Sequence, residues 1–156
     1  MTRSAVPLLL LAACAGHAAP PAAAPALIPI TIESLTADSI AHAMVQRAFT
    51  ADARLETPDS LYLDDAEIIT NGTPRADAPR FAGVSAGGSI QLGSSRFSVT
   101  GSYVWGSVQY RWVPATPAGK LVEGWATFVI VRRRTGDWRI AHVHSSTPAP
   151  ADAAGG

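Results

Sequence analysis

The chain has 156 residues, 12 basic and 12 acidic side chains, and a formal net charge of zero. Its length suits one compact domain and is too short for two ordinary ones. Hydrophobic residues make up 47% of the chain and charged residues only 15%, which excludes a chain that is disordered throughout. Without a basic excess, the composition also argues against nucleic acid as a partner, because nucleic-acid binding needs a concentrated cationic surface.

The N-terminus has the pattern of an export signal. Arg3 precedes an apolar run over residues 5–11, which is too short to span a bilayer as a permanent helix. The run ends in Leu11-Ala12-Ala13-Cys14, which resembles the lipobox of bacterial lipoproteins, where the cysteine is acylated and becomes the mature N-terminus. We therefore expect a lipoprotein signal peptide over residues 1–13 and lipidation of Cys14. The alternative is an ordinary cleaved signal with a chance cysteine.

The expected location is the cell envelope, because the acylated Cys14 would hold the protein on a membrane. Ala15 is not the aspartate that often retains lipoproteins at the inner membrane, which favours the outer membrane, facing the periplasm. Residues 14–29 are rich in alanine and proline and are expected to form a tether, since proline interrupts both helix and sheet. Residues 148–156 have the same composition and are expected to be a disordered tail. The folded domain is thus expected over residues 30–147.

Two segments early in the domain carry helix signals, and a third carries a weaker one. Thr36 is a candidate N-cap for a helix over residues 37–53, with one apolar stripe at helical spacing. Thr57 precedes Pro58 and starts a second, short helix that ends near residue 63. A strand over residues 66–70 follows and ends at the turn signal Asn71-Gly72. Asp77 is the expected cap of a third short helix that ends before residue 87.

The rest of the domain is rich in strands. Four strands are expected over residues 89–100, 103–113, 121–133 and 137–145, with glycine and proline between them. Because helices come first and strands later, the fold class is α+β, with N-terminal helices packed on a strongly curved, mostly antiparallel sheet. Such a cone-shaped sheet can enclose a pocket, with Trp105, Trp112 and Trp125 expected near its walls.

Three segments carry a resemblance to a known family, namely residues 61–68, residues 124–127 and residues 136–146. Together they resemble the nuclear transport factor 2-like superfamily, and within it the SnoaL-like and ketosteroid-isomerase-like proteins. The resemblance covers about residues 34–147 and implies the cone-shaped α+β barrel. It does not imply one activity, because this fold hosts isomerases, dehydratases, cyclases and binding proteins.

The residues that ketosteroid isomerases use are not matched in this chain. The resemblance puts the base position at Thr70 or Asn71, the tyrosine position at Ala48, and the acid position near Ala126 or Thr127. None of these side chains can act as the corresponding acid or base near neutral pH. A steroid-type isomerase is therefore disfavoured.

His142 and His144 form the sharpest local pattern. They are two apart on an expected strand, so both imidazoles point to one face, where they could transfer a proton, polarise a carbonyl or contribute to a metal site. No third metal ligand is evident, so no metal is expected, and the alternative is that both histidines are structural. Asp65 is the candidate partner in catalysis, although Asp64-Asp65 is more typical of a turn. The candidate ligand-binding residues are Tyr62, Tyr103, Trp105 and Trp125.

The expected function is the binding of a small hydrophobic or carbonyl-containing molecule in the cone pocket, with no cofactor. One alternative is a lyase or isomerase of SnoaL-like type, in which His142 or His144 transfers a proton without a cofactor. The other alternative is a non-catalytic interaction module. Proteins of the resembled family commonly dimerise through the open face of the sheet, and we expect a homodimer in which that face carries Trp112, Phe128 and Ile130.

Overall fold

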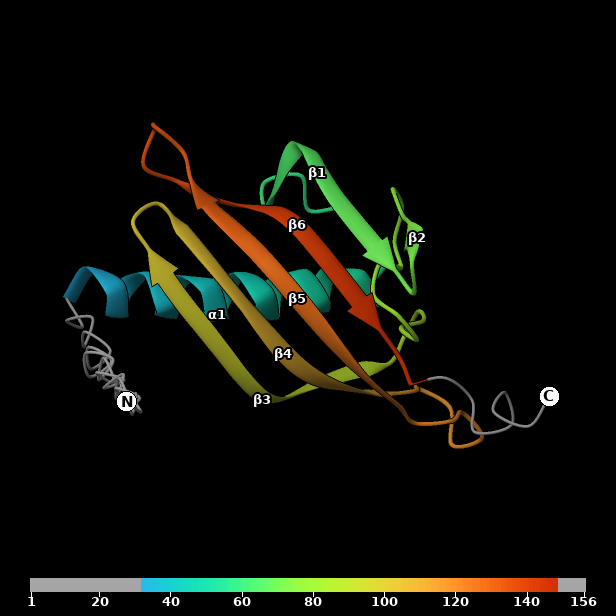
Figure 1. The fold of residues 1–156 in the computed structure, drawn as a ribbon. Coiled ribbons are helices and arrows are strands. Elements are labelled where there is room, and N and C mark those ends of the chain that lie inside the picture. The colour runs from blue at the N-terminus through green and yellow to red at the C-terminus, as the bar shows by residue number, and fades with distance from the viewer. Residues whose placement is uncertain (1–31, 149–156) are drawn as a thin grey trace, which may run out of the picture.

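One helix lies across one face of a curved sheet in the computed structural model, which describes residues 32–148 (Figure 1). The expected signal peptide, the acylated Cys14 and the tether lie outside the described residues, as does most of the expected tail. The described elements are α1 (Ile32–Ala53), β1 (Tyr62–Thr70), β2 (Thr73–Pro74), β3 (Ser89–Thr100), β4 (Tyr103–Val113), β5 (Val122–Arg132) and β6 (Trp138–Ser146).

The six strands form one sheet in the order β2-β1-β6-β5-β4-β3. All neighbouring strands run antiparallel except β1 and β6, which are parallel. Asn71 and Gly72 both have positive φ angles, of 48° and 78°, and form the tight turn between β1 and β2. The sheet is curved but does not close into a barrel, and the α+β fold class expected from the sequence is confirmed.

Helix α1 buries the apolar stripe that the sequence predicts. Ala41, Val45, Ala48 and Phe49 recur at spacings of three and four residues, and all are almost completely buried. The helix begins five residues before the expected start, so Thr36 lies inside it and is not its N-cap. α1 packs mainly against β3 and β4, the two strands at the end of the sheet farthest from β1 and β2.

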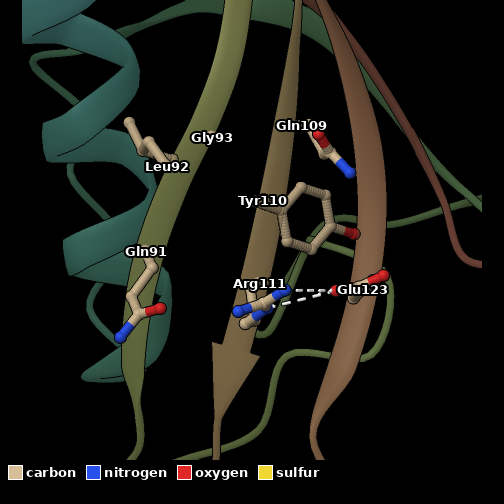
Figure 2. A pocket seen from close by; sticks show the side chains of 7 residues that line it. All are labelled: Gln91, Leu92, Gly93, Gln109, Tyr110, Arg111 and Glu123. Carbon is tan, nitrogen blue, oxygen red and sulfur yellow. Dashed lines mark hydrogen bonds and ion pairs between the residues drawn. The ribbon is translucent and has the colours of Figure 1, made fainter.

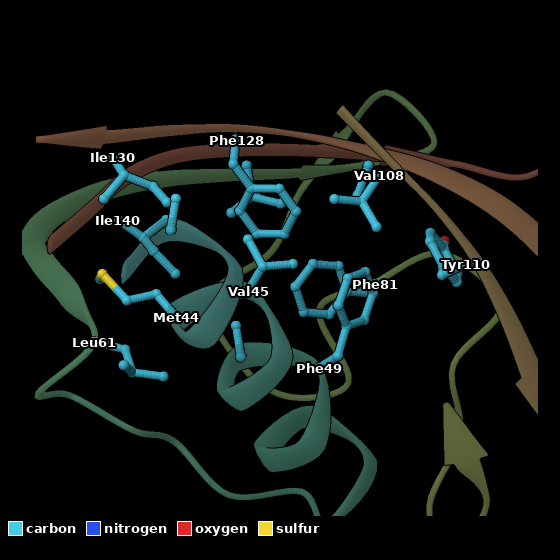
Figure 3. Packing of buried hydrophobic residues seen from close by; sticks show 14 of the residues in the cluster. Met44, Val45, Phe49, Leu61, Phe81, Val108, Tyr110, Phe128, Ile130 and Ile140 are labelled. Atoms are coloured by element: carbon cyan, nitrogen blue, oxygen red, sulfur yellow. The ribbon is translucent and has the colours of Figure 1, made fainter. Parts of the chain in front are cut away.

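Aromatic rings fill the space between the helix and the sheet (Figure 3). Phe49 from α1 stacks on Phe81 with the ring centroids 3.9 Å apart, and Tyr110 and Phe128 pack around this pair at 4.9 and 6.0 Å from Phe49. All four side chains are almost completely buried. The centre of the cone is thus occupied by side chains, and Trp112, which was expected near a pocket wall, is also buried there.

The prediction of two short helices after α1 is wrong, because the structure has neither of them. At the first, the N–H of Leu61 donates to the carbonyl of Pro58 at 2.8 Å, and this single turn leads directly into β1. At the second, the N–H groups of residues 80–82 donate to buried side chains of α1 and β6 rather than to helix carbonyls. Tertiary hydrogen bonds therefore replace the local ones that the helix signals favoured.

The four C-terminal strands agree with the prediction within one residue at each end, while β1 begins four residues earlier and β2 was not predicted. The alternation of side chains along β4 and β5 shows that one expectation is wrong, namely which residues lie on the open face of the sheet. Trp112, Phe128 and Ile130 are buried on the inner face, toward α1, and are not available to a second copy. No helix among the described residues has the length and apolar composition needed to cross a bilayer.

Replacing Phe49 with alanine should destabilise the protein by about 3–5 kcal/mol, because it leaves a cavity among aromatic rings that are already close-packed. Urea denaturation followed by circular dichroism measures the free energy of unfolding. Leu35→Ala is the control, since Leu35 is exposed on the same helix and should cost less than about 0.5 kcal/mol. An equally small loss for both variants would show that the aromatic interior is not tightly packed.

Candidate ligand-binding site

His142 and His144 lie on the outer face of the sheet, the face turned away from α1. Their neighbours in the strand, Val143 and Ser145, are fully buried, whereas His144 is exposed and His142 is partly exposed. His142 Nδ1 lies 3.1 Å from Glu67 Oε2 on the adjacent strand β1. The expectation that both imidazoles share one face is confirmed, but the carboxylate that contacts His142 is Glu67 and not Asp65.

Three of the predicted ligand-binding residues share that outer face. Tyr103 and Trp105 from β4 are 56% and 58% exposed, and Trp125 from β5 is 48% exposed. Trp105 pairs across the strands with Val129, which in turn pairs with His142. The exposed aromatic side chains and the histidine pair therefore lie on one face of the sheet, which we call the outer aromatic face.

Strand alternation separates residues that the sequence analysis grouped in one interior pocket. Along β4 and β5 the even-numbered residues face the core, so Trp105 and Trp125 face away from it. Asp65 is exposed on β1, and Tyr62 is buried at the start of the same strand. Of the predicted site residues, Tyr62 alone lines the pocket described below.

A short segment, residues 80–82, is held by buried polar side chains from four elements. The N–H of Arg80 donates to both oxygens of Asp52 in α1, at 2.7 and 2.8 Å, and the N–H of Phe81 donates to Oδ2 at 3.0 Å. The carbonyl of Arg80 accepts from the hydroxyl of Thr70 in β1.

The other end of this segment is held at Ala82. The N–H of Ala82 donates to Ser145 Oγ in β6 at 3.0 Å, and its carbonyl accepts from the hydroxyl of Tyr110 in β4 at 2.6 Å. The segment is thus fixed to the helix and to three strands at once. We call residues 80–82 the anchored segment.

Burial controls the ionisation of the groups around the anchored segment. Burial raises the pKa of Asp52 above its ordinary value, although hydrogen bonds from the N–H groups of Phe81 and Arg80 and the Arg80 charge act in the opposite direction. Burial also raises the pKa of Tyr62 to about 12, against the lowering effect of Arg80. The pKa of Tyr110 rises for the same reason, so both phenols are neutral at physiological pH.

A pocket of about 270 Å³ lies beside the anchored segment and the inner side of β1. We call it the β1 pocket. Its walls combine apolar surface from the strand with two arginines, and it is lined by Asp59, Tyr62, Leu63, Asp64, Ala66, Ile68, Arg75, Ala76 and Arg80. Arg80 is buried and its guanidinium lies over the Tyr62 ring, with Cζ 4.9 Å from the ring centroid. The backbone N–H of Arg75 donates to the carbonyl of Ile68 at 2.8 Å, which fixes this part of the pocket lining to β1.

One further hollow adjoins the β1 pocket, and another lies on the other side of the sheet, at β3 and β4. One of about 360 Å³ shares four lining residues with the β1 pocket and continues past Asp65 to Arg133 and Arg139. Another of about 220 Å³ lies where a bulge separates β3 from β4, with Arg111 paired to Glu123 at 2.7 Å beside it (Figure 2). Both arginines of the first hollow face Asp137, whereas Arg80 has no such carboxylate partner.

Arg80 and Asp52 are the site residues that the sequence analysis missed. Asp52 follows Phe49 by three residues and Ala48 by four, so helical spacing alone places this carboxylate in the buried stripe. For Arg80 the sequence holds no comparable signal, because its burial depends on contacts with distant parts of the chain. Among the described residues, no group of three or more histidine, cysteine, aspartate or glutamate side chains could hold a metal ion.

Comparison with solved structures identifies the architecture. The chain is similar to a nuclear transport factor 2-like superfamily protein from Salmonella enterica serovar Typhimurium, with a TM-score of 0.61, 14% identity, and coverage of 79% of this chain and 99% of that one. The chain has the nuclear transport factor 2-like fold. An NTF2-like protein of unknown function from Pseudomonas putida is similar with a TM-score of 0.55, 20% identity, and coverage of 77% and 92%.

A ketosteroid isomerase-like protein from Erwinia carotovora is also similar, with a TM-score of 0.53, 16% identity, and coverage of 72% and 96%. No family model and no curated protein matches the sequence. At these identities the likeness extends to the NTF2-like fold alone. In this example of the fold, Ala48, Thr70 and Ala126 are buried, and the Thr70 hydroxyl donates to a backbone carbonyl.

The stability of the Asp52→Asn variant relative to the unmodified chain should rise between about pH 4 and about pH 7. Because burial raises the pKa of Asp52, the folded state binds a proton on this carboxyl more tightly than the unfolded state does. The unmodified chain therefore loses folding stability as the pH rises through that range and the carboxyl ionises. Asparagine does not titrate there. Thermal melts of both proteins across the range measure the difference.

Asp137→Asn is the matched control with the opposite sign. The hydroxyl of Thr135 hydrogen-bonds to Asp137 and lowers the pKa of its carboxyl, so the aspartate gains stability as the pH rises. This variant should lose stability relative to the unmodified chain as the pH rises through about 4, the ordinary pKa of aspartate, and should change little above about pH 5, so its melts are also recorded at pH 3. Parallel pH profiles for Asp52→Asn and the unmodified chain would contradict the raised pKa of Asp52.

Proposed function

We propose that this protein is an exported, lipid-anchored domain that binds a small hydrophobic or carbonyl-containing molecule in the β1 pocket. The observation that carries the proposal is the composition of this pocket, in which buried aromatic and aliphatic surface adjoins a buried guanidinium. Ligand sites generally combine apolar walls with a few convergent polar groups. The NTF2-like fold supports a binding role without specifying a ligand.

The anchor proposed for this domain rests on the Leu11-Ala12-Ala13-Cys14 pattern and on the alanine- and proline-rich residues that follow it. Acylation of Cys14 would attach the protein to the outer membrane, with the domain facing the periplasm. An acyl-anchored domain at that location suits the capture of a small molecule within the cell envelope. This part of the proposal depends on the sequence alone.

Proton transfer by His142 or His144 is the second candidate function, as a lyase or isomerase reaction that needs no cofactor. The observation that favours it is the contact between His142 and Glu67, since a carboxylate on one ring nitrogen orients an imidazole for proton transfer at the other. Both groups of this pair are open to solvent in the described chain. Binding in the β1 pocket is therefore the better-supported function.

The outer aromatic face supports a homodimer. Tyr103 and Trp105 expose large aromatic surfaces next to each other on β4, and Trp125 exposes a third on the same face of β5, where it pairs with Gln109. Exposed aromatic surface of this kind is typical of an interface. We propose that a second copy covers this face in an isologous dimer. The interface residues proposed here replace Trp112, Phe128 and Ile130, which are buried.

Filling the β1 pocket should abolish ligand binding. Ala76 is exposed at the rim of the pocket, so Ala76→Trp should block the pocket and leave the fold intact. Native mass spectra of the full-length chain, released from detergent, should show a reproducible extra mass that this variant lacks. Ala43→Trp is the matched control, because Ala43 is exposed on α1 and does not line the β1 pocket. Retention of the extra mass by Ala76→Trp would show that the ligand binds elsewhere.

Introducing a charge on the outer aromatic face should break the dimer. Trp105→Asp places an unpaired carboxylate within the proposed interface and should weaken dimerisation by at least about tenfold, or 1.4 kcal/mol. Sedimentation velocity of the full-length chain in detergent measures the monomer and dimer fractions. Leu35→Asp is the control, since Leu35 is equally exposed but belongs to α1. A dimer unaffected by Trp105→Asp, or a monomeric unmodified chain, would contradict the proposed interface.

A further inference from the structure

The guanidinium of Arg80 is a buried cation that feels the charge of Asp52 but forms no direct ion pair within residues 32–148. Only 7% of the residue is exposed, and its Nε atom is buried with no hydrogen-bond partner. Among the described residues, no carboxylate forms an ion pair with this side chain. Buried charges in proteins are normally paired, because the loss of hydration must be offset by another charge or by hydrogen bonds.

The surrounding structure holds the backbone of Arg80 in place. The backbone N–H of Arg80 donates to Asp52 and its backbone carbonyl accepts from Thr70, so the backbone is fixed on both sides of this residue. The guanidinium lies over the buried ring of Tyr62, whose π-electrons offset part of the charge while Nε keeps no hydrogen-bond partner among the described residues. A buried guanidinium on a backbone held in this way is well placed to pair with an anion that enters the pocket.

The nearby carboxylates are oriented toward other partners or lie at the rim. Asp52 accepts three backbone hydrogen bonds from Arg80 and Phe81. Asp59 and Asp64 line the β1 pocket but are exposed, and neither is paired with Arg80. Arg75 is the second cation of the lining, so the pocket itself holds two positive and two negative groups. Of these four, Arg80 is the one that is buried.

We infer that the β1 pocket takes a small organic carboxylate, whose anionic group pairs with the buried guanidinium of Arg80 and whose carbon skeleton packs on Tyr62, Ala66 and Ile68. This inference rests on the proposed binding function and names the class of its ligand. A carboxylate fits because its two oxygens match the planar fork of a guanidinium. The apolar walls require an organic group beside the anion, and Asp59 and Asp64 at the rim disfavour a dianion such as phosphate.

Matched pairs of acids and amides test this inference directly. Benzoate and benzamide, and hexanoate and hexanamide, differ in charge but little in shape. We measure the affinity of the full-length chain for each compound from the concentration dependence of its melting temperature, in a neutral detergent. Each carboxylate should bind at least about tenfold more tightly than its amide, which corresponds to 1.4 kcal/mol. Inorganic phosphate should produce no specific shift.

Two variants locate the effect. Arg80→Met keeps the length of the side chain without its charge and should bring the ratio of acid to amide affinity close to one. Arg80→Lys keeps the charge but loses the planar fork and should give an intermediate ratio. Arg96→Met is the control, because Arg96 is exposed on β3, at the opposite edge of the sheet from β1 and β2, and should keep the full ratio.

The possible outcomes separate this inference from the function on which it rests. If acids and amides bind equally well to the unmodified chain, the carboxylate assignment is wrong while binding in the β1 pocket stands. If none of the four compounds shifts the melting temperature, both the assignment and the proposed binding site are wrong. A preference for acids that persists in Arg80→Met would also overturn the assignment. Because the acid–amide comparison uses the unmodified chain, it holds even if an Arg80 variant fails to fold.

Discussion

The hydrogen bonds to the anchored segment connect the helix with the sheet, and the rest of the interior depends on them. Side chains from α1, β1, β4 and β6 converge on the backbone of three consecutive residues, 80–82. Each bond satisfies a polar group that would otherwise be buried without a partner. The same bonds place Phe81 over Phe49 and Arg80 over Tyr62. The aromatic interior and the proposed binding pocket therefore have a common structural origin.

Much of the fold could be predicted from the sequence because its signals are local. The apolar stripe of α1 and the glycine-bounded strands β3 to β6 depend on periodicity over short distances, and the structure has them nearly where they were expected. The two short helices failed because their signals are also local, while the outcome was decided by partners far along the chain. Asp52 lies 28 residues from Arg80, and Ser145 lies 63 residues from Ala82.

The candidate site was harder to predict for the same reason. Tyr62 was predicted to be a ligand-binding residue, but no local pattern marks Arg80 as buried. Assigning Trp105, Trp125 and the two histidines to an interior pocket required a choice between the two faces of the sheet. That choice depends on which residues α1 covers, and helical periodicity gives the face of the helix but not the face of the sheet.

A β-bulge in β6 determines which face of the sheet carries His142 and His144. The pairing of β5 with β6 shifts between Val129 and Ile130, so that Ala141 is an extra residue between Ile140 and His142. In a strand without that bulge, His142 and His144 would share the face of Ile140, which is fully buried. One residue of strand length thus decides whether the same histidine pattern faces water or the hydrophobic interior. The motif alone does not distinguish a surface pair from an interior acid–base pair.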